Sequence, residues 1–167
     1  MTAVHVTLED DKLRDLLAQV KDPEIPVLSI LDMGILQSVT AKDNGVEVVI
    51  TPTYSGCPAM NTIEFDIKAV LTTAGYDPVV VKSRLSPAWT TDWLSEEGKR
   101  KLLEYGIAPP EKSTTSKRAL FSASEGVHCP KCKSSHTERV SEFGSTACKA
   151  LYRCRDCREP FDYFKCI

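Results

Sequence analysis

Apolar residues recur with helical spacing near the start of the chain and again after residue 58. The first stripe follows Thr7, whose hydroxyl can cap a helix, and comprises Leu13, Leu16, Leu17 and Val20. The second comprises Met60, Ile63, Ile67, Val70 and Leu71. Pro58 suits the first position of that helix, and Gly75 suits its C-terminal cap. A third helix is predicted from Ser95, over SEEGKRKLLEYG, so the pattern indicates three helices.

Runs rich in β-forming residues alternate with these helices. GILQSVTAKDNGVEVVITP holds two such runs around Asn44 and Gly45, which suit positive φ, and therefore predicts a β-hairpin. DPVVVKSRL predicts a third strand. Residues 1–107 thus read as a small α+β domain, with helices packed on a three-stranded sheet. Residues 108–126, rich in Pro, Ser, Thr and Lys, are predicted to be a linker.

Residues 127–167 are predicted to form a separate, ribbon-like β module. A segment this short rarely builds an adequate core without a metal or disulfides. It carries two CxxC pairs, separated by 21 residues: Cys129 with Cys132, and Cys154 with Cys157. Each CxxC turn places two sulfurs within reach of one ion, and four thiolates in a tetrahedron suit Zn²⁺. We therefore predict a structural zinc site on these four cysteines.

The spacing of the cysteines also allows other interpretations of this module. Four thiolates also hold [2Fe–2S] or [4Fe–4S] clusters, and free cysteines can simply pack in a core. Cys148 and Cys166 are surplus to a four-ligand site and are expected to act as small buried hydrophobes. His128 and His136 flank the first CxxC pair. Either one can replace a cysteine as a metal ligand, but a position on the surface or beside the ligands is favoured.

Composition and charge narrow the classes of function. The 167 residues are 42% hydrophobic and 26% charged, with no apolar run approaching the ~18 residues of a membrane span. The acidic N-terminus lacks signal-peptide features, so we expect a cytoplasmic protein without membrane contact. Residues 1–111 carry 10 Lys/Arg and 17 Asp/Glu, whereas residues 112–167 carry 11 and 6. We interpret this basic tail first as a counterweight to the metal-bound thiolates, and second as a surface for an acidic protein or nucleic acid. Nucleic acid is the weaker hypothesis, because basic and aromatic residues interleave little.

The predicted N-terminal domain carries candidate chemistry of its own. Cys57 directly precedes a predicted helix, where free amides favour a thiolate; the alternative is a cysteine packed behind the helix start. In DPEIPVLSILDMGIL, prolines stiffen a segment that presents Asp22, Glu24 and Asp32; the alternative is a solvated turn. Neither a phosphate-binding loop nor a Ser/His/Asp arrangement occurs, so we do not expect an enzyme.

Both tryptophans lie in one short stretch, PAWTTDWLSEEG. Trp89 and Trp93 are four residues apart and can cover one side of the sheet, where they would pack as core or lid. The alternative is a surface that docks a partner, because exposed tryptophans commonly anchor interfaces.

Several of these motifs together resemble known families over nearly the whole chain. DPEIPVLSILDMGIL followed by GCPAM and a helix resembles the small domain of SufT-like and eukaryotic cytosolic Fe–S targeting proteins. PAWTTDWLSEEGKRKLLEYGIAPP, FGSTACKALYRC and EPFDYFK resemble the PaaD family, whose members are named as subunits of the bacterial phenylacetyl-CoA epoxidase system.

The resemblance implies an accessory role in aerobic phenylacetate catabolism. That oxygenase has a diiron catalytic subunit and a reductase with flavin and [2Fe–2S], and the PaaD component is regarded as a maturation factor. By this resemblance, Cys57 corresponds to a cysteine that binds iron or an Fe–S cluster transiently in the related domains. Asp22 and Glu24 correspond to the acidic signature of the same domain. The implied partners are the other oxygenase subunits, especially the Fe–S reductase. A zinc-folded scaffold and an Fe–S electron carrier are the alternatives, and a homodimer stays open.

Overall fold

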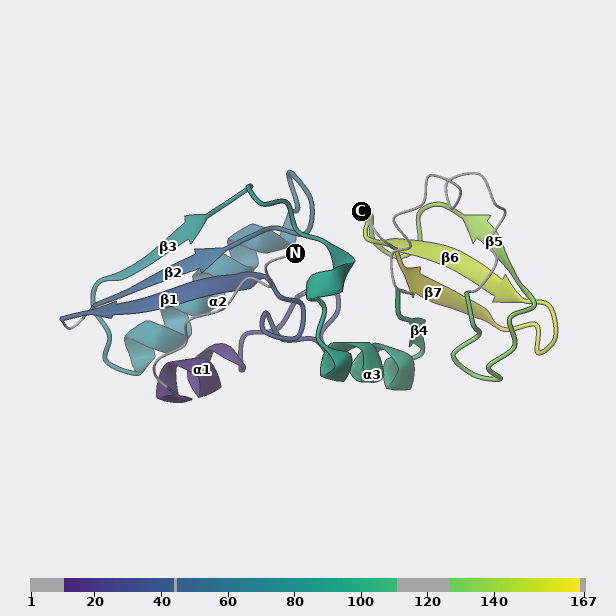
Figure 1. Cartoon of the computed structure of the whole chain (residues 1–167), viewed down its shortest axis with the longest axis horizontal. Helices are drawn as coiled ribbons and strands as arrows, with labels where there is room; N and C mark the ends of the chain where they lie inside the picture. The colour runs from purple at the N-terminus through teal and green to yellow at the C-terminus, as the bar shows by residue number, and fades with distance from the viewer. Residues whose placement is uncertain (1–10, 44, 111–126, 166–167) are drawn as a thin grey trace. The chain divides into compact units, whose positions relative to one another are not determined.

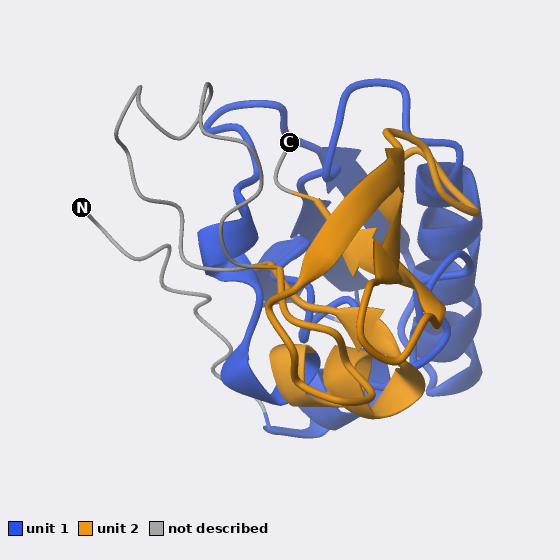
Figure 2. Cartoon of the chain, turned by 90° about the vertical axis from the view of Figure 1, so that its right-hand side faces the viewer, with its two compact units in different colours: residues 1–98 blue, residues 99–167 orange. Residues whose placement is uncertain are grey.

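The computed structural model describes residues 11–43, 45–110 and 127–165. The chain divides into two compact units, residues 1–98 and 99–167 (Figure 2). We expected the first domain to reach residue 107, but Ile107 and Ala108 form β4, which pairs with the last strand of the second unit. Residues 111–126, most of the predicted linker, lie outside the described residues.

The first unit contains a three-stranded sheet with helices packed on it (Figure 1). Its elements are α1 (Asp11–Leu17), β1 (Leu36–Lys42), β2 (Gly45–Ile50), α2 (Ala59–Thr73), β3 (Val79–Ser83), the 3-10 turn η1 (Thr91–Trp93) and the start of α3 (Glu96–Tyr105). The sheet order is β1-β2-β3, with β1 antiparallel and β3 parallel to β2. The crossover between the parallel strands is α2, as such a connection requires. Thr7, the predicted cap of the first helix, lies outside the described residues.

Helix α2 packs against both β3 and α1. Its apolar stripe is fully buried at Ile63, Ile67 and Leu71, and each such side chain contributes about 2 kcal/mol by leaving water. The helix ends as predicted at Gly75, which has φ 95°; its N–H donates to the carbonyl of Thr72, and the N–H of Tyr76 donates to that of Leu71. These two bonds satisfy carbonyls that the helix end would otherwise leave unpaired.

The β1–β2 hairpin differs from the prediction in its turn. Among the described residues of the turn, positive φ falls on Asp43, at 52°, whereas Gly45 has no positive φ and already pairs with Lys42 as the first residue of β2. Asn44 lies outside the described residues. Gly45 is small for another reason: a Cβ there would meet the carbonyl oxygen of Pro78 at 2.7 Å. A close approach of the backbone, rather than turn geometry, explains this glycine.

The segment before α3 closes over the loop between α1 and β1. Trp89 is buried, and its Nε1 donates to the carbonyl oxygen of Met33 at 2.7 Å. The N–H of Ser95 donates to the carbonyl of Asp32 at 2.8 Å, while the Ser95 hydroxyl caps α3 by accepting from Gly98 N–H at 2.9 Å. For Trp89, the packing interpretation is therefore confirmed over the docking one.

The second unit is built on a four-stranded sheet of order β4-β7-β6-β5. Its strands are β4 (Ile107–Ala108), β5 (Thr137–Ser141), β6 (Lys149–Cys154) and β7 (Pro160–Phe164). Strand β4 runs parallel to β7, and the other pairs are antiparallel. The small core comprises Ala108, Val127, Cys129, Ala150, Tyr152, Cys154 and Phe161, with Tyr163 packed against it. None of the described helices combines the length and apolar character that crossing a membrane requires.

Candidate metal centre

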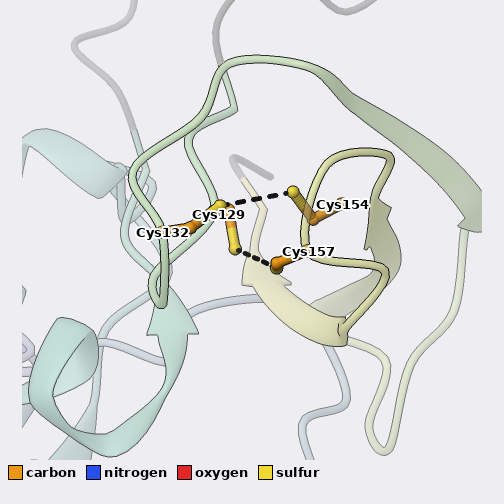
Figure 3. A group of neighbouring side chains, drawn as sticks. All are labelled: Cys129, Cys132, Cys154 and Cys157. Atoms are coloured by element: carbon orange, nitrogen blue, oxygen red, sulfur yellow. Dashed lines mark hydrogen bonds between the residues drawn. The ribbon is translucent and has the colours of Figure 1, made fainter.

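Two tight turns, residues 129–133 and 154–158, bring four cysteines together at one end of the ribbon, and we call them the first and second knuckles. The sulfurs of Cys129, Cys132, Cys154 and Cys157 all lie within 4.8 Å of one another (Figure 3). The Sγ–Sγ distance is 3.7 Å between Cys129 and Cys157, and 3.5 Å between Cys132 and Cys154. Cys154 is the last residue of β6, so the sheet itself delivers it to the cluster.

The size of the sulfur cluster fits a single tetrahedral ion. With Zn–S bonds of about 2.3 Å, the sulfurs of such a site stand about 3.8 Å apart. In a [4Fe–4S] centre each cysteine binds a different iron, and in a [2Fe–2S] centre two cysteines bind each iron. Sulfurs bound to different irons stand farther apart than those around one ion, so neither centre brings all four sulfurs this close together. A thiolate set of this size suits Zn²⁺, which has no geometric preference against four sulfurs.

The two knuckles share one backbone design. Each reverses direction at the residue after its second cysteine, Lys133 with φ 64° and Arg158 with φ 65°. In the first knuckle, Cys129 N–H donates to the carbonyl of Ser134 at 2.9 Å; in the second, Cys154 N–H donates to the carbonyl of Glu159 at 3.0 Å. These closures hold each pair of sulfurs on the same side of its turn.

Backbone amides prepare one sulfur for a metal. The pKa of the Cys154 thiol is lowered to about 7, chiefly because the N–H of Cys157 donates to its sulfur, with a further donation from the N–H of Asp156. For Cys157, the N–H of Glu159 acts to lower the pKa, but burial and the neighbouring thiols outweigh it and raise the pKa to about 12. Four adjacent thiols therefore ionise together only with a cation among them.

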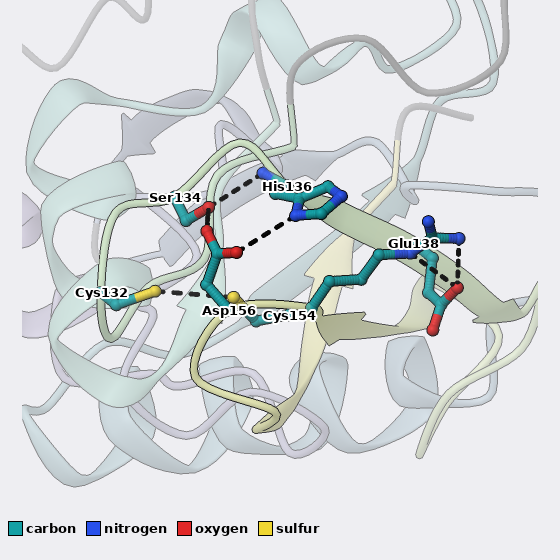
Figure 4. Close-up of polar contacts among 7 residues, drawn as sticks. Cys132, Ser134, His136, Glu138, Cys154 and Asp156 are labelled. Carbon is teal, nitrogen blue, oxygen red and sulfur yellow. Dashed lines mark hydrogen bonds and ion pairs between the residues drawn. The ribbon is translucent and has the colours of Figure 1, made fainter.

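Polar side chains join the two knuckles on their exposed side (Figure 4). Asp156, between the two cysteines of the second knuckle, accepts a hydrogen bond from the Ser134 hydroxyl and lies 3.1 Å from His136 Nδ1. Arg155 donates twice to Oε2 of Glu138, at 3.0 and 2.7 Å. These contacts were not predicted from the sequence, although the acidic residue inside CRDC was an available signal.

The remaining candidates of the tail do not join the sulfur cluster. Within the described part of the chain, neither His128 nor His136 belongs to the group of ligand atoms. Cys148 is buried just before β6, at the other end of that strand from Cys154, with its sulfur 3.0 Å from the Thr146 hydroxyl. This is the expected placement of a small buried hydrophobe. Cys166 lies outside the described residues.

In the first unit, Cys57 occupies the loop that leads into α2. It is partly exposed, its N–H donates to the carbonyl of Tyr54, and its own carbonyl accepts from Met60 N–H, both at 3.3 Å. The preceding Gly56 has φ 81°, and a Cβ there would meet nothing within 4 Å. The Cα of Gly56, next to Cys57 in the chain, therefore faces open space.

The predicted acidic residues serve different roles in the structure. Asp22 is buried, and its Oδ1 accepts from the N–H groups of Glu24 at 2.7 Å and Ile25 at 2.9 Å, which fixes the turn. Glu24 is partly exposed. Asp32 accepts from both the N–H and the hydroxyl of Ser29 at 2.9 Å. Among the described residues, these carboxylates and Cys57 do not gather into a set of three ligand atoms like that of the ribbon.

Comparison with known families matches each unit separately. Residues 10–82 match the family described as iron-sulfur cluster assembly protein, and residues 113–165 match the PaaD zinc beta ribbon domain. A crystal structure of a domain of unknown function from Bacillus anthracis is 32% identical, with a TM-score of 0.52. The match covers 55% of this chain and 89% of that one, and so supports the fold of the first unit.

Two curated relatives extend the match. A putative 1,2-phenylacetyl-CoA epoxidase subunit of Escherichia coli K12 is 52% identical over 152 residues, 91% of this chain and 90% of that protein. The Fe-S protein maturation auxiliary factor of Porphyromonas gingivalis is 36% identical over 101 residues, 59% of this chain and 91% of that protein. The chain therefore belongs to the PaaD family of putative phenylacetyl-CoA epoxidase subunits, in which an Fe–S cluster assembly domain precedes a PaaD zinc ribbon.

Proposed function

We propose that this chain is a non-catalytic accessory subunit of a phenylacetyl-CoA epoxidase system, which assembles or delivers iron or an Fe–S cluster to another subunit. The observation that carries the proposal is the separation of two kinds of cysteine site. The ribbon holds a closed set of four sulfurs, whereas the Fe–S assembly domain holds a single, partly exposed Cys57. A closed set suits permanent structural binding, and an incomplete set suits transient binding.

The ribbon site is proposed to hold one structural Zn²⁺ on Cys129, Cys132, Cys154 and Cys157. When bound, the ion supplies a positive centre that compensates the thiolates and joins the two knuckles. The chain's own part is to present the sulfurs at matching distances and to aim backbone amides at Cys154. The same spacing weighs against the electron-carrier alternative, which needs a cluster in the ribbon.

Cys57 is proposed to be the ligand for the transferred iron or cluster, which is cargo rather than a resident cofactor. The segment that carries Asp22 and Glu24 ends at Ile35, whose carbonyl accepts from the N–H of Thr51 at 2.8 Å, at the start of the Cys57 loop. We propose that Asp22 shapes this site through its two backbone bonds, and that the partly exposed Glu24 supplies an oxygen ligand or a proton acceptor. An incomplete ligand set lets the cargo leave for its client.

The scaffold alternative is favoured by exposed apolar side chains on the ribbon. Val140 and Phe143 lie on β5 and the loop after it, with 57% and 64% of their surface exposed. Exposed apolar patches often mark protein–protein contact sites. Under this alternative the ribbon holds other oxygenase subunits together, and Cys57 is inert.

Replacing Cys57 by Ser in cells that express the whole epoxidase system separates the two functions. We expect lower Fe–S content in the purified reductase or lower iron in the diiron subunit, with subunit association intact. Ser55→Ala, an exposed change two residues away, is the matched control and should leave both contents unchanged. Full metal occupancy of both clients with the Cys57→Ser variant would overturn delivery and leave the scaffold alternative.

A further inference from the structure

The exposed side of the metal centre carries a compact polar cluster of Ser134, His136 and Asp156 (Figure 4). The Ser134 hydroxyl donates to Asp156 Oδ2, and it also accepts from the N–H of His136 at 3.0 Å. His136 Nδ1 lies 3.1 Å from Asp156 Oδ1. Both carboxylate oxygens of Asp156, in the second knuckle, thus contact the segment that leaves the first knuckle.

These residue types do not form a hydrolytic triad. In a triad the imidazole stands between the carboxylate and the hydroxyl, so that it can take the hydroxyl proton. Here the carboxylate stands between them, and the serine proton points at Asp156. No imidazole is placed to take the serine proton, so the cluster does not activate a nucleophile, and we relate its role to the segments that it connects.

Both ends of the cluster attach to backbone that holds a metal ligand. The carbonyl of Ser134 accepts from the N–H of Cys129 at 2.9 Å. Asp156 lies between Cys154 and Cys157, and its own N–H donates to the Cys154 sulfur. The side-chain bonds of Asp156 therefore hold its backbone amide, which contacts the Cys154 sulfur, in place. They also hold this amide close to the backbone of Cys129, through Ser134.

We propose that Asp156 is a positioning residue of the metal centre and that, with Ser134 and His136, it forms a clasp that slows release of the ion. The proposal rests on the proposed zinc site. Cys132 and Cys157 are the exposed ligands, so an ion leaves most readily when the knuckles separate on that side. The clasp spans the two knuckles and must open before they separate.

Residues that orient metal ligands commonly change metal affinity by about 10- to 100-fold when replaced. The side chains of His136 and Asp156 are more than half exposed, at 63% and 56%, so water offsets part of the loss. We expect Asp156→Ala to release zinc about tenfold faster, at the low end of that range. Ser134→Ala removes one hydrogen-bonding hydroxyl and should give a roughly threefold change.

The test measures zinc release from the full, zinc-loaded chain to an excess of a chromogenic chelator. Ser145→Ala is the matched control, because the Ser145 hydroxyl also donates to an aspartate, Asp162, at 2.9 Å, at the other end of the β5–β6 hairpin. Ser134→Ala and Asp156→Ala should accelerate release, and Ser145→Ala should not. Equal release rates for Ser134→Ala and Ser145→Ala would overturn the clasp.

Two further readouts separate positioning from general stability. Co²⁺ in the site reports ligand geometry through its visible absorption, so Asp156→Ala should shift that spectrum while Ser145→Ala leaves it unchanged. Asp156→Asn keeps an oxygen for Ser134 and should restore a slow rate. A wild-type chain that binds no zinc would refute the proposed metal site, whereas one zinc with unchanged spectra and rates in the Ser134 and Asp156 variants would refute the clasp alone.

Discussion

The indole nitrogen of Trp89 donates a 2.7 Å hydrogen bond to the carbonyl oxygen of Met33, 56 residues earlier in the chain. The bond is buried, and it ties the segment before α3 to the loop that precedes β1. That loop contains Asp22, Glu24 and Asp32, so the bond helps to hold in place the backbone that carries the proposed delivery site.

Replacing Trp89 by Phe should destabilise the first unit. Phenylalanine keeps most of the apolar contact but leaves the Met33 carbonyl buried without its donor, which costs about 1–3 kcal/mol. Urea unfolding followed by circular dichroism measures the change. Trp93→Phe is the control, since that side chain is only partly buried; a loss at Trp93 as large as at Trp89 would contradict this role for the bond.

Gly34 and Gly56 offer a matched pair of glycines. Both have positive φ, at 65° and 81°, so alanine at either position costs about 1–2 kcal/mol of backbone strain. At Gly34 a Cβ would also meet the carbonyl oxygen of Trp93 at 2.5 Å, whereas at Gly56 it meets nothing. Unfolding free energies should therefore fall clearly further for Gly34→Ala than for Gly56→Ala, and equal losses would disprove the close approach.

Lys133 and Arg158 have positive φ, so replacing either by glycine should raise the stability of the ribbon. Arg158→Gly relieves about 1–2 kcal/mol of strain but raises the entropy of the unfolded chain, for a net gain of about 0.5–1 kcal/mol. Lys133→Gly should gain less, because it also loses the 3.0 Å bond from Lys133 Nζ to the carbonyl of Pro130. Denaturation of the zinc-loaded chain measures both variants. A stability loss for Arg158→Gly would mean that its side chain makes a contact of its own.

Local signals predicted most of the first unit and the four cysteines whose sulfurs cluster in the ribbon. Gly75 marks a helix end through its own backbone, and each CxxC spacing fixes two sulfurs within one turn. Such features depend on neighbours in sequence, which is why the three helices, the three-stranded sheet and the cysteine cluster were predictable.

Features that depend on distant partners were not predictable from the sequence. Ile107 and Ala108 are too few to show a strand period, and they become β4 only by pairing with Asp162 and Tyr163 in β7. Asp156 reaches Ser134 only after the knuckles meet. Asp22 was predicted as a site residue because its pattern shows a carboxylate; the structure adds that the carboxylate binds two backbone amides.

The most direct test of the central claim is metal removal, followed by hydrogen exchange along the full chain. We expect one zinc per chain after purification without oxygen. A strong chelator should then abolish amide protection over residues 127–165, while residues 11–98 keep theirs, because the ribbon core is small and its knuckles are joined through the ion. A ribbon that keeps its protection after the metal is gone, or that never held one, would contradict the account.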